Sequence, residues 1–163
     1  MKPIVNVHEV PLEDFSKGEL YEEKNAGLSE KIGGKKLGYN ITNVPPGKRS
    51  CPYHNHLVNE EMFFIIEGEG TYRYGGTEYQ VKAGDIIAAP AGGSETAHHL
   101  LNTGKTNLKY LAVSTMESPD ICEYPDSGKF LVNSDVRYGV KDRKLRYIGR
   151  KENALDYWDG EKV

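Results

Sequence analysis

Four of the five histidines lie in two tight groups, His54 with His56 and His98 with His99. Residues two apart in an extended strand point to the same face, so His54 and His56 can present both imidazoles to one point. Glu61 follows five residues later, and an antiparallel neighbouring strand can bring His98 to the same place. Three neutral imidazoles and one carboxylate bind a divalent first-row transition metal well. The spacing therefore predicts one metal ion, Zn, Mn, Fe or Ni, held by His54, His56, Glu61 and His98.

The loop that leads into the paired histidines carries basic and aromatic side chains. It contains Lys48, Arg49 and Tyr53, and we expect Arg49 and Tyr53 to contact a substrate. The planar guanidinium of Arg49 suits a carboxylate or phosphate, although a solvated loop explains these residues equally well. Cys51 is interpreted as structural, because a reactive thiolate needs a nearby base and a lowered pKa. No residue stands out from the sequence as catalytic.

Short strands separated by turns must position these side chains. The chain has 18 glycines and 11 tyrosines among 163 residues, which favours turns and strands over helices. Glycines and prolines end most of the apolar runs. The predicted strands are 37–44, 62–66, 71–74, 77–82, 86–89, 97–102 and 108–115. With no helix between them, they predict an all-β fold of antiparallel strands, a sandwich or a barrel.

The clearest local prediction is a hairpin with a Gly-Gly turn at 75–76. That turn places Arg73 opposite Glu78 and Tyr72 opposite Tyr79. An opposite-charge pair and an aromatic pair both support this register.

The pattern of the chain changes at two points, which divide it into three parts. We predict an N-terminal arm over 1–35, a barrel over 36–118 and a C-terminal extension over 119–163 that packs on the barrel. The arm has no sustained period and is expected to hold one short strand at 4–7. The extension has predicted strands at 130–133 and 145–148 and a helical turn at 154–158. Trp158 is expected to anchor it.

Charge and composition exclude several classes of protein. A net charge of -3 leaves no basic excess to neutralise a nucleic-acid backbone. The apolar run at 62–66 is far shorter than the roughly 20 residues that cross a bilayer, and residues 1–15 show no targeting pattern. We therefore expect a cytoplasmic protein that binds neither nucleic acid nor membrane, with Cys51 and Cys122 as free thiols.

Two motifs in the chain resemble those of the cupin superfamily. The first has the form G-x5-HxH-x3,4-E-x6-G and is matched by the HxH pair, Glu61 and Gly68, with Gly47 one position further out. The second has the form G-x5-PxG-x2-H-x3-N, with five residues here instead of two before the histidine. Its matching residues are Gly84, Pro90, Gly92, His98 and Asn102. The resemblance covers about half of the chain, from 37 to 115.

The resemblance implies the cupin double-stranded β-helix, a jelly-roll barrel, and it selects among neighbouring residues. Spacing to Gly68 favours Glu61 over Glu60 as the ligand. Spacing to Asn102 favours His98 over His99, which is left as an outward-facing or structural histidine. The chain looks like a group of uncharacterised bacterial cupins, and some similar cupins are labelled sugar-phosphate isomerases.

We expect a metal-dependent enzyme that acts on a small polar, carboxylated or phosphorylated molecule. Four protein ligands leave two adjacent coordination positions, which suits isomerase-like chemistry or, with Fe, a dioxygenase. The alternative is a non-catalytic module that binds a small ligand or a metal. A homodimer is also expected, because a small barrel leaves strand edges that need cover and cupins commonly pair.

Overall fold

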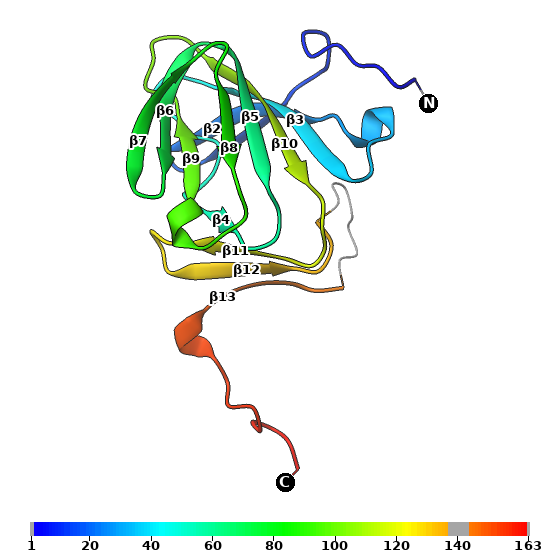
Figure 1. Cartoon of the computed structure of the whole chain (residues 1–163), viewed down its shortest axis with the longest axis vertical. Helices are drawn as coiled ribbons and strands as arrows, with labels where there is room; N and C mark the ends of the chain where they lie inside the picture. The colour runs from blue at the N-terminus through cyan, green and yellow to red at the C-terminus, as the bar shows by residue number, and fades with distance from the viewer. Residues whose placement is uncertain (1, 137–143, 163) are drawn as a thin grey trace.

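The computed structural model describes residues 2–136 and 144–162, and these residues form a chain of short β-strands (Figure 1). Single 3₁₀ turns, η1 (Glu30–Ile32), η2 (Ser94–Thr96) and η3 (Lys151–Asn153), lie between or after them. The strands are β1 (Glu13–Lys17), β2 (Tyr21–Gly27), β3 (Leu37–Val44), β4 (Asn55–His56), β5 (Glu61–Glu67), β6 (Glu69–Tyr74), β7 (Thr77–Lys82), β8 (Ile86–Ala89), β9 (His98–Leu101), β10 (Leu108–Thr115), β11 (Asp120–Tyr124), β12 (Lys129–Asn133) and β13 (Arg146–Arg150).

Two antiparallel sheets enclose the apolar core of the barrel. One has the strand order β1-β2-β3-β10-β5-β8 and the other the order β7-β6-β9. Phe63 and Ile65 of β5 and Tyr110 of β10 belong to the same buried cluster as Tyr72 and Leu100 of the smaller sheet. The all-β jelly-roll prediction is confirmed, and the seven strands predicted between 37 and 115 are all present within a few residues of their expected ends.

A third sheet, of order β13-β12-β11-β4, lies across one end of the barrel (Figure 1). It is joined to the metal-ligand region because β11 pairs with β4, with Cys122 opposite His56 and Glu123 opposite Asn55. The first part of the C-terminal extension therefore sits directly behind one of the predicted ligands. The strands predicted at 130–133 and 145–148 correspond to β12 and β13.

The predicted hairpin is confirmed in detail. β6 and β7 pair with Arg73 opposite Glu78 and Tyr72 opposite Tyr79. Both turn glycines have positive φ, as the primed turn types require. Arg73 also forms two hydrogen bonds with the carboxylate of Asp126, at 2.7 and 3.0 Å, which tie the hairpin to the β11–β12 turn.

The N-terminal arm contains more structure than the sequence predicted. The strand expected at 4–7 is wrong; Val5 and Val7 instead pack on the buried cluster of Ala26, Leu28 and Ile41. The strands of this region are β1 and β2, and β2 pairs with β3 as part of the barrel sheet. The alternation of polar and apolar residues is weak in β2, because its inward positions include polar side chains as well as apolar ones.

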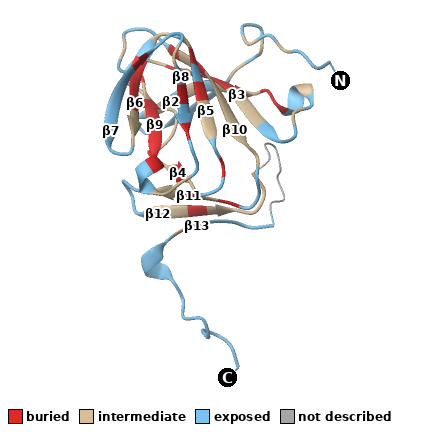
Figure 2. Ribbon diagram, in the orientation of Figure 1, coloured by how far each residue is buried: buried red, intermediate tan, exposed pale blue. Residues whose placement is uncertain are grey.

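The end of the chain also departs from its prediction. The helical turn expected at 154–158 is wrong, because the 3₁₀ turn η3 precedes that segment. Trp158 does not anchor the extension: it is 59% exposed and lies in the solvent-exposed segment that runs away from the barrel (Figure 2). Its ring stacks edge-on only against Tyr157 among the described residues.

Candidate metal centre

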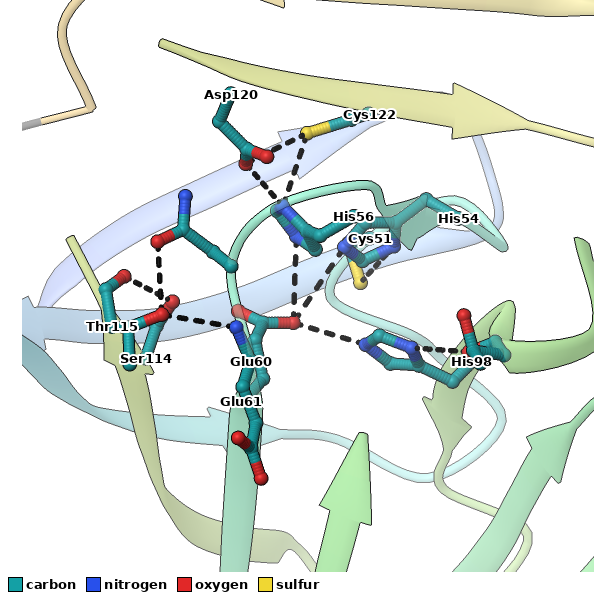
Figure 3. A network of polar contacts seen from close by, with 12 residues as sticks. Cys51, His54, His56, Glu60, Glu61, His98, Ser114, Thr115, Asp120 and Cys122 are labelled. Atoms are coloured by element: carbon teal, nitrogen blue, oxygen red, sulfur yellow. Dashed lines mark hydrogen bonds and ion pairs between the residues drawn. The ribbon is translucent and has the colours of Figure 1, made fainter. Parts of the chain in front are cut away.

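The four predicted ligands converge on a single carboxylate oxygen (Figure 3). The Nε2 atoms of His98, His56 and His54 lie 3.0, 3.6 and 3.8 Å from Oε2 of Glu61. Glu61 opens β5, while His98 opens β9 and forms a two-way backbone bridge with His54, with N–O distances of 3.1 and 2.7 Å. The two barrel sheets thus supply Glu61 and His98, while β4 of the third sheet supplies His56 and the bridge to His98 places His54.

Backbone carbonyls hold the Nδ1 atoms of two of these imidazoles. Nδ1 of His54 donates to the carbonyl of Pro52 at 2.9 Å, and Nδ1 of His98 donates to the carbonyl of Thr96 at 3.1 Å. A carbonyl only accepts, so each Nδ1 carries the proton and a neutral ring leaves a lone pair on Nε2. Lone pairs aimed at a carboxylate repel it unless a proton or a metal cation lies between them. The donor set therefore fits a divalent cation.

His56 is held differently, by the side chain of a residue from the C-terminal extension. Its Nδ1 lies 2.6 Å from Oδ2 of Asp120 and 3.3 Å from Sγ of Cys122. Asp120 and Cys122 are both buried. These three side chains form a second group with metal-binding atom types, next to the group of His54, Glu61 and His98.

Electrostatics at the centre favour a positive charge between the histidines and Glu61. Burial alone raises the pKa of Glu61, but its contacts with His98, His56 and His54 lower it to about 2. Burial likewise opposes the charged form of His56, but its contacts with Asp120, Cys122 and Glu61 raise its pKa to about 10. The fold thus keeps Glu61 ionised and stabilises a cation at this point.

A cavity of about 190 Å³ opens beside Glu61, His54 and His98. Its wall continues over Glu23 and Asn25 of β2 and Asn40 and Thr42 of β3, with Ser50, Cys51 and Tyr110 nearby. Burial raises the pKa of the Cys51 thiol to about 12, which fits its interpretation as a structural residue.

Comparison with known families matches residues 40–114 to the cupin domain. The chain belongs to the cupin superfamily. An oxalate-binding protein of Thermotoga maritima is 39% identical over 70 residues, which is 43% of this chain and 54% of that protein. The chain spans about half the length of the curated relatives it matches.

Two solved structures extend the comparison. A predicted oxalate decarboxylase from Thermotoga maritima is 30% identical, with a TM-score of 0.60 over 69% of this chain and 97% of that one. A protein of Acidithiobacillus ferrooxidans with a provisional sugar phosphate isomerase name has a TM-score of 0.79 over 95% of this chain and 96% of its own, at 21% identity. The second likeness establishes the shared fold alone.

The longer spacing in the second motif has a simple structural explanation in this cupin. Three of the five residues between Gly92 and His98 form the 3₁₀ turn η2, after which Ala97 leads directly into β9. Asn102, the last motif residue, is buried and supports the loop, since its Nδ2 donates to the carbonyls of Val44 at 2.7 Å and Thr106 at 2.8 Å. Gly68 has a φ of +83°, and a Cβ there would collide with the carbonyl of Asn107.

The neighbouring alternatives, Glu60 and His99, are outside the group of side chains around Glu61, although His99 lines the cavity beside it. Glu60 is exposed. His99 is buried with its ring edge against Tyr53, at a centroid distance of 5.4 Å. Burial and the charges of Arg49 and Arg73 lower the pKa of His99 to about 4, so this imidazole is neutral.

The predicted substrate contacts, Arg49 and Tyr53, line a different cavity, of about 380 Å³, on the far side of Ser50 and Cys51. The guanidinium of Arg49 lies 5.8 Å from the ring centre of Tyr21, and Tyr53 is covered by Arg73 at 3.7 Å. The hydroxyl of Tyr53 accepts a hydrogen bond from the Gly76 amide at 3.1 Å. The structure therefore brings the four predicted ligands together but does not bring Arg49 or Tyr53 to Glu61.

Sequence reasoning missed two groups of residues at this centre. Asp120 and Cys122 lie outside the matched motifs, and only the pairing of β11 with β4 brings them to His56. Glu23 and Asn25 come from a segment interpreted as an arm, and the one available signal was their spacing of two.

Among the described residues, no helix is long and apolar enough to span a membrane.

Proposed function

We propose that this cupin is a metal-dependent enzyme that acts on a small polar molecule bound in the cavity beside Glu61. The observation that carries the proposal is the convergence of three imidazole Nε2 atoms on one oxygen of Glu61, within 3.8 Å. His54, His56, Glu61 and His98 would hold one Zn, Mn, Fe or Ni ion. Bound there, such an ion polarises substrate oxygens, and Fe also supports reaction with O₂.

Residues of the chain orient the metal ligands and limit the access of water to the site. Carbonyls of Pro52 and Thr96 and the carboxylate of Asp120 fix the three rings, so the ligands need little rearrangement. The apolar core, including Phe63 and Leu100, lines one side of the cavity and limits access of water. The wall formed by β2 and β3 offers hydrogen-bonding groups to the rest of the molecule.

The names of similar proteins bear more directly on an isomerase-like reaction than on a dioxygenase-like one. One relative is named for binding oxalate and one similar structure for a sugar phosphate isomerase. Oxalate and a sugar phosphate each carry several oxygen atoms, so a molecule of either kind can offer two of them to one metal ion. An isomerase-like reaction needs no redox change of the metal, whereas a dioxygenase-like reaction does.

The test is to load metal-free protein separately with Zn, Mn, Ni or Fe and to incubate each form with simple sugars, sugar phosphates and small carboxylic acids. Product detection by NMR and oxygen uptake by electrode separate the two reaction types. We expect turnover with at least one metal and none with Glu61→Gln. Saturable binding without turnover in every combination would instead identify a non-catalytic binding module.

We also propose that two copies of the chain pair. β1 is an edge strand of the six-stranded sheet and all five of its residues are exposed. An open strand edge is a place where a second chain can add. Light scattering should give twice the 18.2 kDa of one chain, and a constant 18.2 kDa at all concentrations would contradict pairing.

A further inference from the structure

The inner face of the six-stranded sheet is apolar on β5 and β10 and polar on β3 and β2. The cross-strand row Asn25, Thr42, Tyr110 and Ile65 runs from β2 through β3 and β10 to β5. Ile65 and Tyr110 belong to the apolar core, whereas Thr42 and Asn25 are polar residues on the wall of the cavity. A barrel needs no polar inner residues for packing, so this half of the face is suited to a polar occupant.

The polar side chains on this wall are mostly neutral and already fixed by one another. The Thr42 hydroxyl donates to Oδ1 of Asn40 at 2.9 Å, and the hydroxyls of Ser50 and Tyr110 are 2.7 Å apart. Nδ2 of Asn25 donates to Oε1 of Glu23 at 2.7 Å. Hydroxyls and amides held in this way can donate to and accept from a ligand that carries hydroxyl groups.

The charge on the wall is unfavourable for an anion. Among the described residues the lining includes the carboxylates of Glu23 and Glu61 but no lysine or arginine. Glu23 is partly buried, and burial raises its pKa although the hydrogen bond from Asn25 opposes that effect. Arg49, the basic residue expected to bind an anion, lines the other cavity. Glu61 and Glu23 would together offset the two charges of a divalent ion, so a phosphate or carboxylate beside Glu23 would lose water without gaining a net attraction.

A cationic ligand gains no net attraction either, because the charges of Glu23 and Glu61 are offset by the divalent ion. Size restricts the choice further: about 190 Å³ is less than the roughly 300–1,000 Å³ of cavities for drug-sized molecules. What remains is a small neutral molecule that offers oxygens to the metal and hydroxyl groups to the β2–β3 wall.

We propose that the cavity selects a small uncharged hydroxylated molecule, an unphosphorylated sugar or an α-hydroxy carbonyl compound, and that Glu23 acts as the residue that excludes anions. This inference rests on the proposed metal centre and narrows its substrate class. It replaces the expectation, based on Arg49, of a carboxylated or phosphorylated ligand.

The test compares ligands that differ in charge, using protein whose loading with one metal ion per chain has first been measured. Dihydroxyacetone and dihydroxyacetone phosphate test the class, and lactamide and lactate test charge alone because they have the same shape. Isothermal titration at pH 8 should show tighter binding of dihydroxyacetone than of its phosphate.

The variant Glu23→Gln removes the charge and keeps the size of the side chain. It should strengthen lactate binding about tenfold, or about 1.4 kcal/mol, and change lactamide binding less than about twofold. Glu22→Gln is the matched control, because Glu22 is the adjacent residue of β2, carries the same charge and is exposed. It should change neither affinity.

Three results would overturn the inference while leaving the metal centre intact: tighter binding of the phosphate, no gain in lactate affinity in Glu23→Gln, or no binding of either neutral probe. Failure to load metal at the first step would instead contradict the proposed function. Circular dichroism of Glu23→Gln checks that the variant is folded before its affinities are compared.

Discussion

His54 and His98 are held by carbonyls only two residues away in the chain, whereas His56 is held by Asp120, 64 positions later. The first arrangement forms wherever the local loop folds correctly. The second requires β11 of the C-terminal extension to pair with β4. All four ligands therefore lie within residues 40–114, which match the cupin domain, but the orientation and charge of one of them depend on a segment outside that range.

Replacing a metal ligand should have the largest effect on metal binding, whether a backbone carbonyl or Asp120 holds that ligand. His56→Ala and His98→Ala should each lose most of the bound metal, because three remaining ligands bind far more weakly than four. His99→Ala should keep it, since His99 packs on Tyr53. Elemental analysis of the purified variants decides this. If His99→Ala loses the metal while His56→Ala keeps it, the ligand assignment is wrong.

Asp120→Asn tests the support that His56 receives from the C-terminal extension. The carbonyls that hold His54 and His98 belong to the backbone, so no side-chain substitution removes them. We expect metal affinity to fall about 10- to 100-fold, as for other residues that orient a metal-bound histidine. Asp126→Asn is a control: Asp126 is an exposed aspartate paired with Arg73. Competition with a chelator measures both affinities, and an equal loss in the two variants would show a general structural effect.

The pH dependence of stability in the metal-free protein tests the contact between His56 and Asp120. The folded-state pKa of His56 is about 10, above its ordinary value of 6.5. The contribution of His56 to stability is therefore fully present below about pH 6.5 and is lost as the pH rises through about 10. Urea unfolding of chelator-treated protein should show a steeper loss from pH 7 to 10 in wild type than in Asp120→Asn. Parallel pH profiles would contradict this role for Asp120.

Cys122→Ser should have the smallest effect. The sulfur lies 3.3 Å from Nδ1 of His56, but Asp120 already holds that nitrogen at 2.6 Å. A thiol is a weak hydrogen-bonding group, so metal affinity should change less than about threefold. Chelator competition again measures it. A loss as large as that of Asp120→Asn would mean that the sulfur itself contributes to the site.

The sequence predicted what is encoded by local pattern. Alternation and turn residues located the barrel strands, and the HxH spacing with Glu61 and His98 located side chains that do meet in the fold. The inward side chains of β2 and the β4–β11 pairing were missed, because polar inner faces break the hydrophobic pattern and distant pairings leave no local signal. Asp120, Cys122 and Glu23 became visible only when their strands were placed.

The central claim is that a metal ion lies among His54, His56, Glu61 and His98. Anomalous X-ray diffraction at the absorption edge of the loaded metal tests it most directly. We expect one peak per chain, within bonding distance of three Nε2 atoms and the Glu61 carboxylate. A peak beside Asp120, Cys122 and Nδ1 of His56, which form the other group of ligand types, would contradict it, as would no peak after stoichiometric loading.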